Sequence, residues 1–142
     1  MTDTVTAAAA AVDYDAWVNG DDGDPIPQSS APTSIRTIVD LLDIRPGISV
    51  LEIGTGTGYS SALLAEVVGP SGRVVSIDVD QELVERAADL HQRAGHQQVE
   101  IHTADGFAGW PAVAPYDRII GWTTPHVVPQ AWVEQVADGG II

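Results

Sequence analysis

The run from Glu52 to Tyr59 reads Glu-Ile-Gly-Thr-Gly-Thr-Gly-Tyr and has the clearest chemical potential in the sequence. Its glycines follow the apolar run 48–53 and precede a helical pattern, so a ligand can lie against bare backbone near a helix N-terminus. A dinucleotide-binding turn needs a third glycine where Tyr59 stands, and a P-loop needs a lysine, which this sequence lacks. The run therefore predicts a different nucleotide-type site, although a tight turn in a ligand-free protein would also use such glycines.

Two aspartates follow the next two apolar runs of the chain. Asp78 comes directly after the run 73–77, about twenty residues beyond the glycines, where a carboxylate can accept hydrogen bonds from both hydroxyls of a ribose. Asp105 follows the run 99–102 and is a candidate acceptor for an adenine amino group. A purely local Asp-Gly turn is the alternative explanation of Asp105-Gly106.

Strand-like and helix-like patterns alternate along residues 31–142. The expected strands are 48–53, 73–77, 99–102 and 117–121, and the expected helices begin near residues 31, 59, 81 and 129. We expect the last helix to carry Trp132 and Val136 and to end at Asp138-Gly139-Gly140, before a new apolar run at Ile141. This alternation predicts an α/β fold of the Rossmann-like, doubly wound type, with a mostly parallel sheet covered on both faces.

The two ends of the chain differ from this pattern. Residues 1–30 combine an alanine run with six aspartates, a composition that predicts an acidic, flexible segment before the folded domain 31–142. Because an apolar run begins at Ile141 and the sequence stops at Ile142, we expect a C-terminally truncated domain whose final strands are missing. Two copies could then pair through the exposed sheet edge.

Composition excludes several classes of function. Six basic residues against 20 acidic ones give a net charge of −14, which argues against nucleic acid or anionic membrane as a partner. There is no cysteine, which excludes a disulfide framework, a thiolate nucleophile and cysteine-bound zinc but leaves the redox compartment open. The apolar run 7–12 is too short to cross a membrane, and a cytoplasmic enzyme is the default expectation. The four histidines lack paired metal-ligand spacing, and no metal is expected: His91, His96, His102 and His126.

An acid, a glycine run and two further acids at the ends of three successive strands resemble the class I methyltransferases, which use S-adenosylmethionine. Four stretches are similar to the protein-L-isoaspartate O-methyltransferase family: 50–59, 105–110, 114–120 and 128–140. The resemblance covers about residues 28–142. It implies that S-adenosylmethionine is the cofactor and that its site comprises Glu52, Gly54, Thr55, Gly56, Gly58, Asp78, Asp105 and Gly106.

The same resemblance suggests the methyl acceptor. Ser30-Ala31-Pro32 matches the family's Ser-x-Pro motif, whose serine lies beside the acceptor, so Ser30 is the candidate catalytic residue and Ser29 an alternate register. The loop after residue 121 departs from the family's small residues, and its candidate substrate contacts are Trp122, Thr123 and His126.

The family also has a longer helical segment before the motif. The implied activity is methylation of an isoaspartyl carboxylate in a protein, or of an ordinary aspartate in a peptide as in the family's peptide-tailoring relatives. A cofactor-binding fragment without activity and an enzyme with a small-molecule acceptor remain alternatives.

Overall fold

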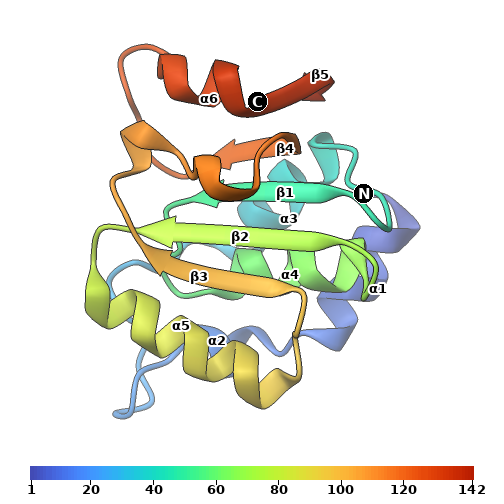
Figure 1. Cartoon of the computed structure of the whole chain (residues 1–142). Helices are drawn as coiled ribbons and strands as arrows, with labels where there is room; N and C mark the ends of the chain where they lie inside the picture. Colours follow the sequence, from blue (N-terminus) through green and yellow to red (C-terminus); the bar gives the residue numbers. More distant parts are fainter.

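A computed structural model describes all 142 residues and contains one five-stranded parallel sheet. The strand order is β3-β2-β1-β4-β5 (Figure 1). The strands are β1 (Ser49–Ile53), β2 (Arg73–Asp78), β3 (Val99–Thr103), β4 (Tyr116–Gly121) and β5 (Val136–Ile141). The helices are α1 (Asp3–Ala11), α2 (Tyr14–Val18), α3 (Pro32–Leu41), α4 (Tyr59–Val68), α5 (Gln81–Ala94) and α6 (Gln130–Gln135), with 3-10 turns η1 (Gly106–Ala108) and η2 (Pro111–Val113).

Alternate residues of each strand point into two separate apolar clusters, because successive side chains of a strand face opposite sides of the sheet. Val50 and Val74 pack against α1 to α4 on one face, together with Leu90 of α5. Leu51 and Val75 pack on the other face, against Trp132 of α6 and the segment around η2. This arrangement confirms the doubly wound α/β fold expected from the sequence.

The N-terminal segment differs from the flexible tail that its composition suggested. Residues 3–18 form α1 and α2, and Val5, Ala8 and Val12 lie on one buried face of this segment. Trp17 is also buried in the same cluster. The apolar residues at helical spacing bury one face of this segment, and the six aspartates of residues 1–30 do not prevent this because they leave that face free.

The end of the chain also differs from the expected long helix. α6 stops at Gln135, and Val136 already pairs with Tyr116 of β4. A Cβ atom on Gly140 would lie 2.9 Å from the Asp117 carbonyl oxygen, so a glycine at this position allows the two strands to approach. Asp138-Gly139-Gly140 therefore belongs to β5 and does not end the helix.

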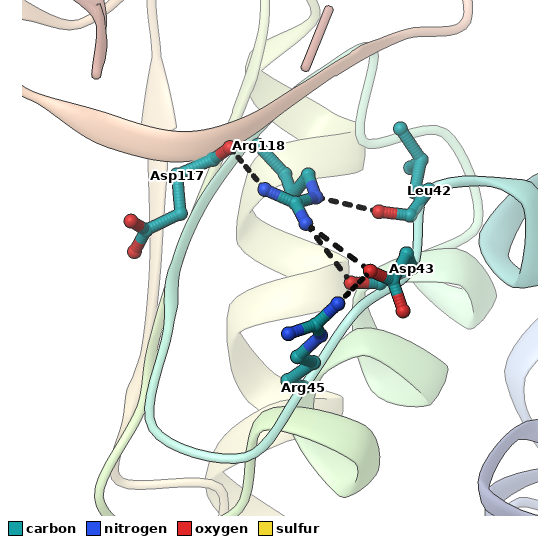
Figure 2. A network of polar contacts seen from close by, with 5 residues as sticks. All are labelled: Leu42, Asp43, Arg45, Asp117 and Arg118. Atoms are coloured by element: carbon teal, nitrogen blue, oxygen red, sulfur yellow. Dashed lines mark hydrogen bonds and ion pairs between the residues drawn. The ribbon is translucent and has the colours of Figure 1, made fainter. Parts of the chain in front are cut away.

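Arg118 of β4 fixes the C-terminal end of α3 to the sheet (Figure 2). Its guanidinium donates to the carbonyl oxygens of Leu42 at 2.5 Å and Asp43 at 3.2 Å, and to that of Asp117 at 2.8 Å. Arg45 pairs with the Asp43 carboxylate and holds the pKa of that carboxyl below its usual value. The network thus holds the end of α3 that lies away from Ser30, since α3 begins at Pro32.

None of these helices has both the length and the apolar character needed to cross a lipid bilayer.

Candidate functional site

A cavity of about 330 Å³ lies at the carboxyl ends of β1, β2 and β4. It is next to the point where the strand order reverses direction around β1, which is the usual ligand site of an open α/β sheet. Its walls come from four segments, and the lining residues are Gln28, Ser30, Ile35, Gly54, Thr55, Gly56, Thr57, Ser60, Asp78, Trp122 and Thr123.

The glycine-rich loop forms the floor of this cavity. The backbone N–H groups of Gly54 and Thr55 both donate to the Ile77 carbonyl, at 2.8 and 3.2 Å, so the loop is bound to the end of β2. Gly54 and Gly56 have φ values of 98° and 51°, in the region that strains other residues. At these two glycines the loop therefore presents bare backbone to the cavity.

Asp78 is held in place by two backbone donors. Its Oδ2 accepts from the N–H of Gly56 at 3.0 Å, and its Oδ1 accepts from the N–H of Asp80 at 3.0 Å. Each carboxylate oxygen keeps a further lone pair for a ligand. The side chain is thus pre-oriented to accept two hydrogen bonds from neighbouring hydroxyl groups.

Glu52 lies beneath the cavity and is completely buried. Its Oε1 accepts from the Ser76 hydroxyl at 2.7 Å, and its Oε2 accepts from the Ser60 hydroxyl and, at 3.1 Å, from the Trp122 indole N–H. Burial raises the pKa of this carboxyl to about 7, against the effect of the three donors. Glu52 does not line the cavity itself, but Ser60 and Trp122 do.

Ser30 forms part of the opposite wall and is held by the N-terminal helices. The Tyr14 hydroxyl donates to the Ser30 carbonyl at 2.9 Å. The Tyr14 ring packs edge-on against Tyr59 with the centroids 4.9 Å apart, and Arg36 donates to the Tyr59 hydroxyl at 3.0 Å. The segment before α3 is therefore built onto the first turn of α4, directly after the glycine-rich loop.

Residues 6–142 match the model of the family described as Protein-L-isoaspartate(D-aspartate) O-methyltransferase (PCMT). The chain belongs to this family. It is 42% identical over 113 residues to the protein-L-isoaspartate O-methyltransferase of Ignicoccus hospitalis, a match that covers 80% of this chain and 54% of that protein. It is 39% identical over 130 residues to the Pyrococcus horikoshii protein of the same name, covering 89% and 58%.

Solved structures agree with this PCMT assignment. A protein-L-isoaspartate O-methyltransferase superposes with a TM-score of 0.89 at 27% identity, over 99% of this chain and 50% of that one. A Plasmodium falciparum protein in complex with S-adenosyl-L-homocysteine has the same fold, with a TM-score of 0.76 at 18% identity over 99% of this chain and 75% of that one. This PCMT chain spans about half the length of the curated relatives it matches.

Seven of the residues singled out in the sequence lie around the one cavity: Ser30, Gly54, Thr55, Gly56, Asp78, Trp122 and Thr123. Gly58 does not. It begins α4 with a φ of 83°, and a Cβ atom there would lie 3.2 Å from both the Trp17 ring and the Ala87 side chain. Gly58 therefore permits close packing of the N-terminal segment and α5 around the loop.

Asp105 and Gly106 line a second cavity of about 260 Å³. Thr123 borders both cavities, which places the second one beside the first. Asp105 accepts from the backbone N–H of Phe107 at 2.9 Å, so the local turn considered as an alternative is present. Its second oxygen has no hydrogen-bond partner within the chain, and the exposed Phe107 side chain lines the same cavity.

Besides Glu52 and Gly58, two further predicted residues lie outside both cavities. Ser29 precedes the lining residue Ser30, and the exposed His126 lies in the loop after β4. Four lining residues were missed by the sequence interpretation: Gln28, Ile35, Thr57 and Ser60. Thr57 and Ser60 are within or just after the glycine run, so proximity alone could have indicated them, whereas Gln28 was in the segment expected to be flexible.

Proposed function

We propose that this chain binds S-adenosylmethionine in the cavity between the glycine-rich loop, Asp78 and Ser30. The observation that carries the proposal is the Asp78 carboxylate, which two backbone N–H groups orient beside glycines with bare backbone. A ribose diol would satisfy its remaining lone pairs. The complex of the Plasmodium falciparum protein with S-adenosyl-L-homocysteine, and the resemblance to class I methyltransferases, support the same ligand.

The second cavity, beside the first, suits the adenine end of S-adenosylmethionine. Asp105 has a free acceptor for an amino group, and the Phe107 side chain offers an apolar face in the same cavity. We infer that the adenine lies there and that the methionine part lies against Gly54 and Gly56. Thr123, which borders both cavities, would then lie between the two ends of the cofactor.

We further propose that the acceptor is a carboxylate of a peptide or protein. S-adenosylmethionine supplies a methyl group on a positively charged sulfonium. A carboxylate acceptor is already ionised at neutral pH, so the chain needs no general base. The Ser30 hydroxyl can donate a hydrogen bond that holds the acceptor in line, and alignment supplies most of the acceleration.

An isoaspartyl carboxylate is the acceptor that the observations favour. The names of the family and of the relatives specify this substrate. The helices α1 and α2 also precede the Ser-x-Pro motif, as expected of the family, although the sequence alone had suggested a flexible tail. The bulky Trp122 in the loop after β4 is the feature that favours an ordinary aspartate in a tailored peptide as the second candidate.

Calorimetric titration of S-adenosyl-L-homocysteine tests the cofactor assignment. Asp78→Ala removes two hydrogen bonds to a charged group and should weaken binding about ten- to a hundredfold. Asp89→Ala is the control, because this exposed carboxylate on α5 pairs only with Arg93 and should leave the affinity unchanged. Equal affinities of the two variants would reject Asp78 as the ribose ligand.

Two synthetic peptides that differ only in an aspartyl or isoaspartyl linkage test the acceptor. Mass spectrometry would follow the methyl ester, and preference for the isoaspartyl peptide supports the first candidate. Preference for the aspartyl peptide supports the second. If neither peptide is methylated while S-adenosylmethionine binds, the chain is a cofactor-binding unit or has a small-molecule acceptor.

Pairing of two copies through β5 is a further proposal. β5 is bound to β4 on one side only, and its other side carries no strand. An uncovered strand edge can pair with the same edge of a second copy.

A further inference from the structure

The Glu52 carboxylate joins three separate segments of the chain under the cavity. Ser76 of β2, Ser60 of α4 and Trp122 of the loop after β4 all donate to it. Ser76 in turn shares a hydrogen bond of 2.7 Å with the Thr55 hydroxyl of the glycine-rich loop. The buried acid is therefore the centre of a network that reaches each of these segments.

Three members of this network, Thr55, Ser60 and Trp122, line the cavity, whereas Glu52 has no exposed surface. Trp122 is the bulkiest residue of the wall, and its Cβ would lie 3.3 Å from a Cβ placed on Gly54. Trp122 thus lies directly beside the glycine-rich loop, where its side chain forms part of the cavity wall. The indole N–H donates its hydrogen bond to Glu52 Oε2.

We propose that Glu52 is a positioning residue that fixes the Trp122 indole, and that this indole is the wall that determines what fits beside the glycine-rich loop. This inference rests on the proposed function for the identity of the occupant. It assigns Glu52 a different role from the cofactor contact that the sequence resemblance implied. Under this proposal Glu52 holds Trp122, and Trp122 shapes the cavity.

The charge of Glu52 governs how firmly the indole is held. Burial raises the pKa of its carboxyl to about 7, and the charge of Asp78 at the end of β2 adds to this. The other groups that face it, Ser60, Ser76 and Trp122, do not titrate near neutral pH. A hydrogen bond to an ionised carboxylate is roughly twice as strong as one to a neutral carboxyl, so the anchor strengthens as pH rises through 7.

Nitrogen-15 NMR of the indole N–H groups tests the anchor without any ligand. The chain has four tryptophans, and the signal lost in Trp122→Phe belongs to Trp122. We expect this signal to shift with a midpoint near pH 7 and to lose that shift in Glu52→Gln. A signal that stays constant across neutral pH, or that titrates equally in Glu52→Gln, would overturn the inference.

Calorimetry with S-adenosyl-L-homocysteine tests the effect on the cavity. Trp122→Phe keeps an aromatic ring but removes the pyrrole part of the indole together with its anchoring N–H, so it tests the anchor and the wall together even if Glu52→Gln fails to fold. We expect it to weaken binding about three- to tenfold. Trp110→Phe is the matched control, because that ring stacks on His102 and lies outside the cavity.

Wild-type affinity in Trp122→Phe would reject Trp122 as the determining wall. If the wild-type chain itself does not bind S-adenosyl-L-homocysteine, the proposed function fails, and the NMR titration still decides whether Glu52 holds the indole.

Discussion

Burial favours the neutral forms of Glu52 and His91, which lie on β1 and α5. It raises the pKa of Glu52 from 4.5 to about 7 and lowers that of His91 from 6.5 to about 3. His91 shares hydrogen bonds with the Ser61 hydroxyl at 2.9 Å and with His96 Nδ1 at 2.8 Å. Neither residue lines the cavity that contains Ser30. Both are hydrogen-bonded to serines in the first turn of α4, which begins directly after the glycine-rich loop.

The two residues should give opposite pH dependences of stability. Between pH 3 and 6.5, His91 binds a proton in the unfolded chain but not in the folded chain. The contribution of His91 to the free energy of unfolding therefore rises with pH. Between pH 4.5 and 7, Glu52 binds a proton in the folded chain but not in the unfolded chain. The contribution of Glu52 to the free energy of unfolding therefore falls with pH. Each slope approaches about 1.4 kcal/mol per pH unit. We therefore expect nearly constant stability where the two windows overlap.

Urea denaturation at several pH values checks this expectation. Glu52→Gln should leave stability rising up to pH 6.5, and His91→Gln should leave it falling from pH 4.5 to 7. Asp40 and Asp43, whose pKa values are lowered from 3.8 by Thr2 and Arg45, change the stability only below about pH 3.8, and they do so equally in both variants. Parallel pH profiles in the wild type and both variants would contradict the pKa shifts.

The sequence predicted the structural position of some site residues but not of others. Asp78 was predictable because its position after the second strand fixes it at the carboxyl edge of the sheet. The burial of Glu52 was not, because its donors Ser60, Ser76 and Trp122 stand 8, 24 and 70 residues away along the chain. Only the folded sheet brings them together.

At the scale of elements, the sequence predicted the strands β1 to β4 to within about a residue, because each is a short apolar run bounded by turn residues. It did not predict α1 and α2. Their stability depends on packing Val5, Ala8 and Trp17 against α4 and α5, and short helices gain little from local propensity. The boundary between α6 and β5 was also missed, since pairing with β4 decides it.

Arg86 should be a clamp between the N-terminal segment and the glycine-rich loop. Its guanidinium donates to the Thr57 carbonyl at 3.0 Å and to the Asn19 carbonyl at 2.8 Å. Arg86→Gln should destabilise the fold by about 1–3 kcal/mol, because it leaves two carbonyl groups without a charged donor. It should also increase cleavage of residues 19–30 in limited proteolysis.

Arg93→Gln is the matched control for this clamp. Arg93 lies on the same helix, but it is exposed and pairs only with Asp89 at 2.7 Å, an interaction worth less than about 1 kcal/mol. Equal losses of stability and equal proteolysis in the two variants would show that Arg86 does not fix the N-terminal segment to the glycine-rich loop.

At the scale of the whole molecule, charge and the free sheet edge act against each other. The net charge of −14 opposes contact between copies, while the unpaired side of β5 favours it. Salt screens the first effect, since the screening length falls from about 30 Å at 0.01 M to about 10 Å at 0.1 M. Salt has little effect on backbone hydrogen bonding between two β5 edges.

We therefore predict that the chain associates more strongly as salt concentration rises, as measured by sedimentation velocity at several protein concentrations. Ile141 lies at the end of β5 and is 40% exposed, so Ile141→Lys should weaken association by placing a charge at the pairing edge. Leu41→Lys is the control, because Leu41 is 76% exposed but lies at the end of α3. A monomer at every salt and protein concentration, or equal weakening by both lysine variants, would show that β5 does not mediate association.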